Sequence, residues 1–374
     1  MLLSAEAGGF LGGTQVNIDE LVSKLVKARG SDLHLKAGVP PMIRANGVLK
    51  ALEGYEVLRP ADTEDIIGDI MSEKRLEEFE LEGEADFSYT VKGVGHLRAN
   101  AFRQRGAVSI AMRFIPFRPP KLEDLGLPKV IGDLAEEERG IILVTGTTGS
   151  GKSTTLAGML DHVNRTSAKH IVTIEDPIEY LHRDEKSIVN QREVGSDTVS
   201  YSRALRRILR QDPDIILIEI RDSDSAQIAL SAAETGHLVL STLHTLDATE
   251  TINRMIDLFP PHERAQARAM LAGTFRGIVG QRLIRTKDGQ GRVAVCEVMV
   301  ATGRIRDFIM DPAQTGQIQT AISEDEYYGM QTFDQALLKL IEDDRVTYEE
   351  ALRIASRPQD FRLMVQSLGL GVAR

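Results

Sequence analysis

Short apolar runs alternate with helix-spaced apolar patterns through the middle of the chain. Four runs read as buried parallel strands, because each is continuously apolar and ends in polar or turn residues: GIILVTG, HIVTIED, DIILIEI and HLVLSTLH. The segments between them, 151–166, 200–211 and 223–236, have the spacing of helices. This alternation predicts βαβ units and an α/β fold with a parallel sheet covered by helices.

The first third of the chain has a different pattern. Short alternating segments separated by turn signals predict a small antiparallel sheet, with helices near Ile18–Lys27 and Ala61–Leu81. We expect an N-terminal α+β domain over residues 1–115. Residues 116–128 contain several prolines and are predicted to form a linker. The second domain then covers residues 129–374. Its last 110 or so residues are expected to be mostly helical, with a helical C-terminal part over about 300–374.

Composition narrows the classes of function. The 374 residues favour two domains, and a net charge of -10 argues against a general nucleic-acid binder. The single cysteine, Cys296, excludes an internal disulfide and a multi-cysteine zinc site, which fits a reducing compartment such as the cytoplasm. No apolar run is long enough to span a bilayer, so membrane association is expected only through a partner.

The segment GTTGSGKS has the pattern of a phosphate-binding P-loop. It follows a predicted strand and opens a predicted helix, which is the context this motif requires. Glycines let backbone N–H groups approach phosphate oxygens, Lys152 reaches the β- and γ-phosphates, and Ser153 binds Mg²⁺. ATP and Mg²⁺ are therefore the expected ligands, and the nucleotide-binding residues are Gly146, Thr147, Thr148, Gly149, Ser150, Gly151, Lys152, Ser153 and Thr154.

Carboxylates follow two of the predicted strands. Glu175, Asp176 and Glu179 come after HIVTIED, and could order the water shell of a metal or polarise an attacking water. A solvated acidic loop explains them equally well. Glu219 ends the strand DIILIEI, where an acid can hold Mg²⁺ through water and orient the nucleophile. Glu219 is therefore the leading catalytic candidate.

Two histidines, His237 and His244, flank one further strand. Either imidazole could sense or stabilise a γ-phosphate, although a lone histidine at a strand end is more often structural. The spacing argues against a shared metal site, because seven residues of extended chain separate the two histidines by about 20 Å.

Arginines are concentrated at the end of the first domain. Five of them fall in about twenty residues without an acid: Arg98, Arg103, Arg105, Arg113 and Arg118. They could supply an arginine finger that reaches nucleotide across a domain or subunit boundary. The alternative is a solvated face that balances the acidic run from Glu73 to Asp86, and for any single arginine this alternative is favoured.

These motifs, in this order, resemble the secretion and type IV pilus ATPases, and most closely the PilT-type retraction ATPases. The similarity covers about Val16 to Phe361. Besides the P-loop it includes RGSDLHL, PPMIRANG, TIEDPIEY, NQREVG, AAETGHLVLSTLHT and GMQTFDQ. The resemblance implies a hexameric motor with a PAS-like N-terminal domain and a RecA-like ATPase domain, with nucleotide between them.

The resemblance also assigns roles to residues. It implies that Glu179 and Glu219 carry catalysis, and we add His244 as a catalytic candidate. His237 and His244 would couple nucleotide state to subunit contacts. Arg98 and Arg113 match the N-terminal arginine positions of the family, and we assign Glu175 and Arg221 to the same group of sensor and intersubunit residues.

Retraction, and with it twitching motility, is preferred over extension or secretion. Extension and type II secretion ATPases usually carry a four-cysteine zinc module and an added N-terminal domain, which this chain lacks, and GRIRDFIMD partly resembles an element of the retraction subgroup. An engine for pilus extension, type II secretion or DNA uptake remains the alternative. The implied partners are further copies in a homohexamer, an inner-membrane platform protein and a paralogous retraction ATPase. The expected location is the cytoplasmic face of the inner membrane.

One departure from the family pattern concerns Glu219. The family has a glycine before this acid, whereas here Ile218 is followed directly by Glu219. Side chains alternate between the faces of a strand, so a regular strand is expected to aim Glu219 away from the site. Either a shorter turn after Pro213 compensates, or the chain is a nucleotide-binding ring subunit that hydrolyses ATP weakly.

Overall fold

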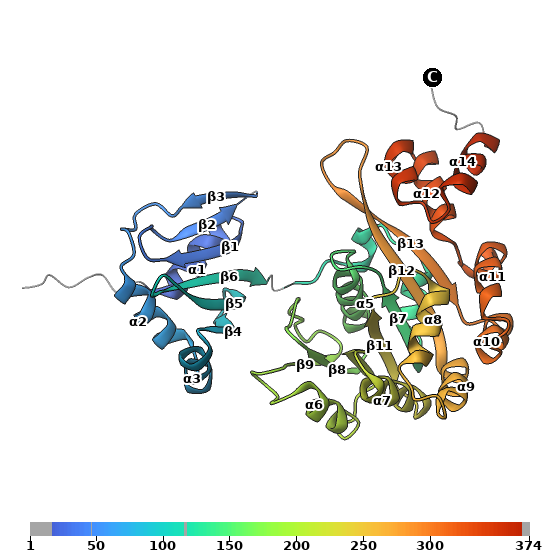
Figure 1. Cartoon of the computed structure of the whole chain (residues 1–374), viewed down its shortest axis with the longest axis horizontal. Coiled ribbons are helices and arrows are strands. Elements are labelled where there is room, and N and C mark those ends of the chain that lie inside the picture. The colour runs from blue at the N-terminus through green and yellow to red at the C-terminus, as the bar shows by residue number, and fades with distance from the viewer. Residues whose placement is uncertain (1–16, 46, 116–117, 369–374) are drawn as a thin grey trace, which may run out of the picture. The chain divides into compact units, whose positions relative to one another are not determined.

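The computed structural model describes residues 17–45, 47–115 and 118–368, and the chain falls into two compact units, residues 1–117 and 118–374 (Figure 1). The segment predicted as a linker includes a short 3₁₀ helix, η1 (Leu122–Leu125), that packs within the second unit. Leu122 and Leu125 contact the same core as the helix of the P-loop, because their apolar side chains can be buried there.

The first unit is built on an antiparallel six-stranded sheet with the order β3-β2-β1-β6-β5-β4. Its helices bury apolar side chains against the sheet, among them Leu21, Leu25, Ile67 and Phe79. The elements are α1 (Ile18–Lys27), β1 (Gly30–Lys36), β2 (Met42–Ala45), β3 (Val48–Ala51), α2 (Pro60–Ile70), α3 (Glu73–Glu82), β4 (Glu84–Val91), β5 (Gly95–Gln104) and β6 (Ala107–Ile115).

The single helix expected over Ala61–Leu81 is instead two helices, α2 and α3. The chain is extended at Met71 and Ser72, with ψ angles of 145° and 155°, and Ser72 occupies the N-cap position of α3. Serine is a common N-cap residue, although the Ser72 side chain makes no capping hydrogen bond here. The apolar spacing continued across this break and concealed it.

The second unit contains a seven-stranded sheet in the order β13-β12-β7-β11-β10-β8-β9. Neighbouring strands are parallel except for β12 and β13, which form an antiparallel hairpin at one edge. The strands are β7 (Gly140–Thr145), β8 (His170–Glu175), β9 (Ile188–Glu193), β10 (Ile215–Glu219), β11 (Leu238–Leu243), β12 (Phe275–Arg285) and β13 (Arg292–Val300).

Three of these strands were missed from the sequence. β9 lies at the sheet edge and its residues IVNQRE are mostly polar, so it lacks a buried-strand pattern. β12 contains Gly277 and Gly280, which weaken a strand signal, and β12 and β13 fall in a region expected to be mostly helical. The predicted strands at the centre of the sheet, β7, β8, β10 and β11, are all present.

Helices cover both faces of this sheet, as a doubly covered parallel sheet requires. One face packs against η1, α4 and α5, and the other against α6 to α11. The helices are α4 (Val130–Ala135), α5 (Lys152–Thr166), α6 (Tyr201–Ile208), α7 (Ser223–Glu234), α8 (Ala248–Asp257), α9 (Arg264–Thr274), α10 (Gly303–Met310), α11 (Ile318–Glu324), α12 (Phe333–Glu342), α13 (Tyr348–Ile354) and α14 (Pro358–Ser367).

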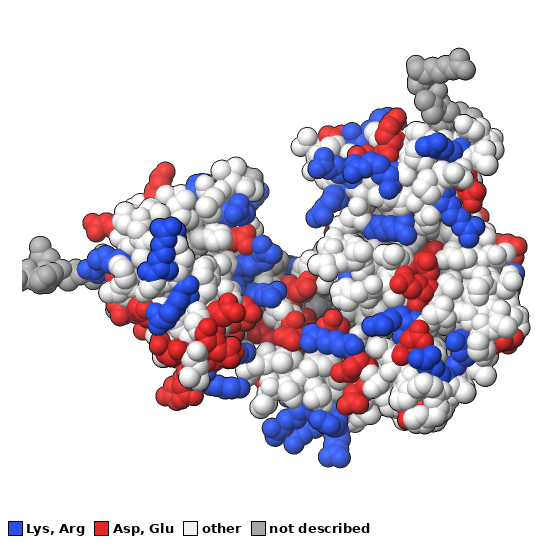
Figure 2. All heavy atoms as spheres, viewed as in Figure 1, with Lys and Arg blue, Asp and Glu red and all other residues white. Residues whose placement is uncertain are grey.

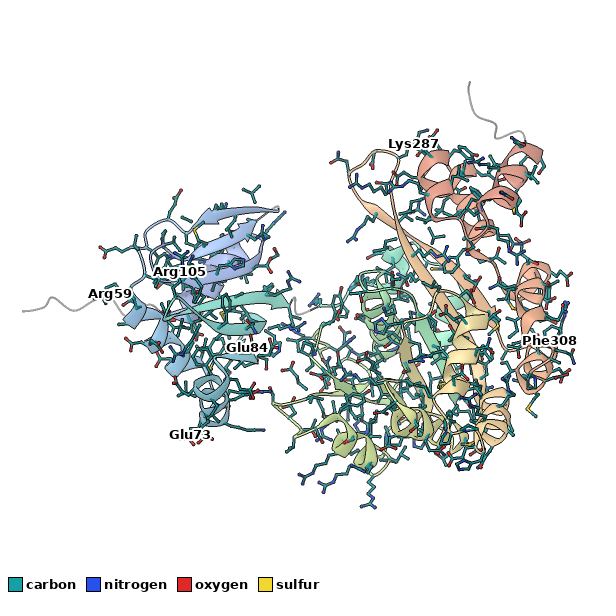
Figure 3. All side chains as sticks on the ribbon, viewed as in Figure 1. Arg59, Glu73, Glu84, Arg105, Lys287 and Phe308 are labelled. Atoms are coloured by element: carbon teal, nitrogen blue, oxygen red, sulfur yellow. The ribbon has the colours of Figure 1, made fainter. Side chains whose placement is uncertain are left out.

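The β12–β13 hairpin contacts the C-terminal helices along its length. Near the P-loop, Gln281 of β12 lies opposite Cys296 of β13, and the Cys296 carbonyl accepts a hydrogen bond of 2.9 Å from the Gln331 side chain. At the other end, the backbone N–H of Lys287 donates to the carbonyl of Arg345 at 2.8 Å, beyond α12. Figure 3 labels Lys287, which lies in the loop that joins the two strands.

Within the described ranges, no helix combines the length and the apolar character needed to cross a bilayer.

Candidate active site

A cavity of about 220 Å³ lies where β7, β8, β10 and β11 end. Parallel strands bring their carboxyl ends to one edge of the sheet, and ligands of such sheets bind outside that edge. The cavity is lined by the P-loop and the start of α5, by the segment after β8 and by the ends of β10 and β11. Its polar lining includes Lys152, Ser153, Glu175, Glu179, Glu219 and His244.

The P-loop glycines are required by the backbone conformation. Gly146, Gly149 and Gly151 have φ angles of 139°, 79° and 93°, in the region that favours glycine. A Cβ atom on Gly146 would lie 2.4 Å from the Gln281 carbonyl oxygen, and one on Gly151 would lie 2.6 Å from Gln281 Nε2. The loop therefore keeps its shape by packing directly against β12.

Lys152, the first residue of α5, folds back over the loop. Its ammonium donates to the carbonyl oxygens of Gly146 at 2.8 Å and Thr147 at 3.1 Å, and the residue is 8% exposed. Burial lowers the pKa of the ammonium, while Glu179 and Glu219 oppose that shift. Further along α5, the Thr154 hydroxyl shares a 2.9 Å hydrogen bond with Tyr180, and Thr155 donates to the Gln281 amide oxygen at 2.7 Å.

The acids at the end of β8, Glu175, and after it, Asp176 and Glu179, differ in their surroundings. Glu175 is partly buried and accepts hydrogen bonds from Thr173 at 2.7 Å and from Gln191 at 3.1 Å. Burial raises the pKa of Glu175, and these hydrogen bonds oppose the rise. Asp176 and Glu179 are exposed, and both line the cavity. A purely solvated loop does not describe Glu175, which is held by its neighbours.

Glu219 lies in the cavity even though β10 is a regular strand. Each residue from Ile215 to Glu219 pairs in parallel register with β11. Ile216 and Ile218 face the core beneath α6 and α7, so Leu217 and Glu219 face the opposite side, where α5 and the P-loop lie. The expectation that a regular strand aims Glu219 away from the site is therefore wrong.

The reason lies in the turn before β10. Asp214 is outside the strand, where its carboxylate accepts from the backbone N–H of His170 at 2.8 Å, and Asp212 has a positive φ of 54°. The burial of the isoleucines fixes which face each strand residue takes. The spacing between Asp214 and Glu219 is therefore no guide to the orientation of the glutamate.

Two basic side chains flank the carboxylate of Glu219. Arg221 Nε donates to Glu219 Oε2 at 2.8 Å, and the Arg221 guanidinium also donates to Asp176 Oδ2 at 3.0 Å. His244 Nε2 lies 3.7 Å from Glu219 Oε1, with its side chain 57% exposed. Arg221, expected as a sensor or intersubunit residue, thus links the two acidic segments within its own unit.

His237 lies at the opposite edge of the sheet. It precedes β11, where its Nδ1 is 2.9 Å from the Ala232 carbonyl oxygen, and its own carbonyl accepts from Gly140 at 3.0 Å. The structure therefore brings His244 to the cavity and leaves His237 among backbone groups at the amino ends of the strands.

Arg98 and Arg113 are directly opposite each other on β5 and β6 of the first unit. Arg113 Nε donates to Asp32 Oδ1 at 2.9 Å, and the neighbouring Arg103 contacts Glu64 and Glu80 at 2.8 and 2.9 Å. Figure 2 displays the acidic side chains that gather around α3 in this unit. Charge balance within the unit accounts for Arg103, while the nucleotide-sensing role of Arg98 and Arg113 remains a prediction.

Several contacts to the site were not foreseen. Gln191, Gln281, Tyr180 and Tyr201 support the P-loop or the acids by hydrogen bonds. Gln191 lies within NQREVG, a motif noted in the sequence without a role for its residues. Tyr180 ends TIEDPIEY, directly after Glu179, and that motif likewise gave it no role. Gln281 and Tyr201 have no local signal, because they reach the site from elements that are distant in the sequence.

The geometry agrees with comparisons to known proteins. Residues 96–353 match the family model of the type II/IV secretion system proteins. The type IV pilus retraction ATPase PilT of Pseudomonas aeruginosa is 45% identical over 92% of this chain and 100% of its own length. The type IV pilus ATPase PilU of the same organism is 39% identical over 94% of this chain and 92% of its own.

A solved structure extends the similarity to the fold. The pilus retraction motor PilT with bound ADP superposes with a TM-score of 0.85 at 42% identity, covering 93% of this chain and all of that one. The predicted α/β fold with a RecA-like core and an N-terminal domain is confirmed, as is the predicted family. The chain belongs to the type II/IV secretion system protein family, and within it resembles the retraction ATPases over nearly its whole length.

Proposed function

We propose that this chain is an ATP-hydrolysing motor that powers type IV pilus retraction and twitching motility. The observation that carries the proposal is the placement of Lys152 and Glu219 in one cavity at the carboxyl edge of the sheet. The names of the relatives agree with this reading, since PilT is described as a retraction ATPase and its structure holds ADP.

The P-loop binds the phosphates of ATP. Its backbone N–H groups and the amino end of α5 provide a positive field for phosphate oxygens. Lys152, now bonded to two loop carbonyls, is placed to exchange them for the β- and γ-phosphates. The loop is thus pre-formed against Gln281, and only the lysine has to change partners.

The donor set of the cavity fits Mg²⁺. The Ser153 hydroxyl and the carboxylates of Glu175, Glu179 and Glu219 are oxygen donors, which this hard cation prefers. Ser153 would hold the ion directly and the glutamates through water. When bound with ATP, the ion would offset the charge that develops on the phosphates.

Hydrolysis is assigned to Glu219, assisted by Glu179 and His244. Glu219 orients the attacking water and accepts its proton, while Arg221 and His244 keep the carboxylate in place. Glu175 positions the segment that carries Glu179. Because Glu219 lines the cavity, we favour the active motor over a weakly hydrolysing ring subunit.

The assembly we propose is a homohexamer at the cytoplasmic face of the inner membrane. In the ring, Arg98 and Arg113 would contact nucleotide or the neighbouring subunit, which suits arginines at a subunit boundary. His237, which lies away from the cavity, would contact the neighbouring subunit. An inner-membrane platform protein would receive the force, and a paralogous retraction ATPase would act beside the ring.

The direct test is ATP hydrolysis by the purified chain with Mg²⁺. We expect Lys152→Ala to lower kcat at least about 100-fold, because the phosphates lose their cation. Lys50→Ala, at an exposed lysine of β3, should match the parent. Undiminished turnover in Lys152→Ala would refute the assignment.

A cellular test separates retraction from extension. Deleting the gene from its source organism should leave surface pili present, or in excess, while twitching stops. Loss of surface pili would instead assign the motor to extension.

A further inference from the structure

The last residue of β10 extends beyond the pairing of β10 with β8, one of its two neighbouring strands. β10 pairs with β11 as far as Glu219, but its pairing with β8 runs from Ile215 to Leu217. The peptide groups of Glu219 thus lie beyond the last β8 pair, at a partly buried position. Buried backbone N–H and C=O groups need hydrogen-bond partners, which a neighbouring strand would normally supply.

The hydroxyl of Tyr201 supplies both partners. It donates to the Glu219 carbonyl oxygen at 2.6 Å and accepts a hydrogen bond from the Glu219 backbone N–H. A hydroxyl can donate and accept at the same time, as this arrangement requires. Burial raises the pKa of Tyr201 above its ordinary value, so the hydroxyl keeps its proton. One side-chain oxygen therefore takes the place of the missing strand.

Tyr201 is itself held in a fixed place. It is the first residue of α6, and its ring packs against the core between the sheet and α6. On another side, the guanidinium of Arg221 lies 4.8 Å from the ring centroid. That same guanidinium binds the Glu219 carboxylate and Asp176. The backbone and the side chain of Glu219 are thus held by two residues that contact each other.

We propose that Tyr201 is a positioning residue for Glu219. Its hydroxyl anchors the peptide groups at the end of a strand that lacks the family's glycine, and so keeps the carboxylate aimed into the cavity. Misplacing a catalytic group by about 1 Å can cost about 100-fold in rate, so such an anchor has a measurable effect. The inference rests on the proposed ATP hydrolysis, because it assigns Tyr201 to the same reaction.

The test removes the hydroxyl and keeps the ring. Tyr201→Phe should lower kcat about tenfold, the size expected for the loss of two hydrogen bonds to the reacting residue's backbone. KM for ATP should stay within about twofold, because the P-loop is untouched. Tyr89→Phe is the matched control: it removes a hydroxyl bonded to Asp19 at 2.8 Å in the first unit, and should match the parent.

A second measurement does not depend on turnover. Backbone amide exchange at Glu219 should accelerate in Tyr201→Phe, since its partner is lost, while exchange at Leu240 in β11 stays as in the parent.

The outcomes separate the two proposals. Unchanged kcat in Tyr201→Phe would overturn the positioning role, and so would a parallel rise in KM or faster exchange throughout the sheet, which indicate general loosening. A parent without ATPase activity would overturn the proposed function and the catalytic part of this inference. Local exchange at Glu219 would then still decide whether the anchor exists.

Discussion

In the seven-stranded sheet, the carboxyl ends of the strands (the carboxyl edge) and the amino ends (the amino edge) carry similar residues that make different contacts. At the carboxyl edge, Glu219 and His244 line a cavity with Lys152. At the amino edge, Asp214 accepts from the backbone of His170, and His237 lies against the Ala232 carbonyl. The acids come from the two ends of β10 and the histidines from the two ends of β11, so composition alone does not distinguish them.

The difference teaches that strand direction decides which polar residues can act. At the amino edge, acids and imidazoles satisfy turns and helix ends, because backbone groups surround them. At the carboxyl edge, the P-loop and the start of α5 border a cavity in which the Glu219 carboxylate contacts the side chains of Arg221 and His244. Substitutions at the carboxyl edge should therefore lower kcat, whereas substitutions of the same residue types at the amino edge should lower the free energy of unfolding.

The largest expected effect comes from the two acids. Glu219→Gln should lower kcat by about 100-fold or more, because the general base is removed, with ADP affinity retained. Asp214→Asn should keep kcat within about threefold and instead lower the free energy of unfolding by about 1 kcal/mol, through a weakened turn. Steady-state kinetics and urea unfolding of both variants provide the measurement. Equal kinetic losses at the two positions would erase the distinction between the edges.

A smaller effect is expected from a glycine inserted between Ile218 and Glu219. The insertion restores the family spacing, but β10 already places Glu219 in the cavity. An added residue should displace the carboxylate or its Tyr201 anchor and lower kcat about tenfold or more. ATPase assays of the parent and the inserted chain measure this. Faster turnover after insertion would mean that the parent's Glu219 is poorly aimed.

The smallest effect concerns Glu297 of β13, which is buried outside the cavity. Its carboxylate accepts from the Ala248 N–H at 2.7 Å and from Gln319 at 3.1 Å, and burial raises its pKa to about 7. A raised pKa means that the folded state binds more protons than the unfolded state between about pH 4.5 and pH 7. The contribution of Glu297 to the free energy of unfolding therefore falls as pH rises through that window.

Between pH 6 and pH 8 the loss attributable to Glu297 should be about 1 kcal/mol. Glu297→Gln does not titrate, so its free energy of unfolding should decline less over the same range. Urea unfolding of parent and variant at both pH values tests this. Parallel pH profiles for the two proteins would show that Glu297 does not titrate there.

Much of the site could be predicted because its signals are local. The P-loop glycines, Lys152 and Ser153 follow one strand and open one helix, and the positive φ angles of the loop explain why glycine occupies those positions. Glu219 and His244 end two apolar strands, so a parallel sheet places them at one edge. The family assignment followed from the order of such motifs, and the similarity to PilT confirmed it.

The rest depends on tertiary contacts that a sequence does not display. The face taken by Glu219 is set by the isoleucines of β10, whereas counting residues from Asp214 gave the wrong face. The anchoring by Tyr201 joins α6 to β10, and Gln281 reaches the P-loop from a hairpin hidden in a region expected to be helical. Asp222, next to Arg221, caps α7 by accepting from the Ser225 N–H at 2.9 Å.

The β12–β13 hairpin has a mechanical consequence. Gln281 would be struck by any side chain on Gly146 or Gly151, so the P-loop backbone rests against β12 without clearance. On β13, the Cys296 carbonyl accepts a hydrogen bond from Gln331, which precedes α12. In the loop of the hairpin, Lys287 donates to the carbonyl of Arg345, which follows α12. β12 and β13 are paired from Gly277 to Arg285, and this continuous pairing makes the hairpin stiff. A displacement of the P-loop should therefore be passed by the hairpin to the C-terminal helices.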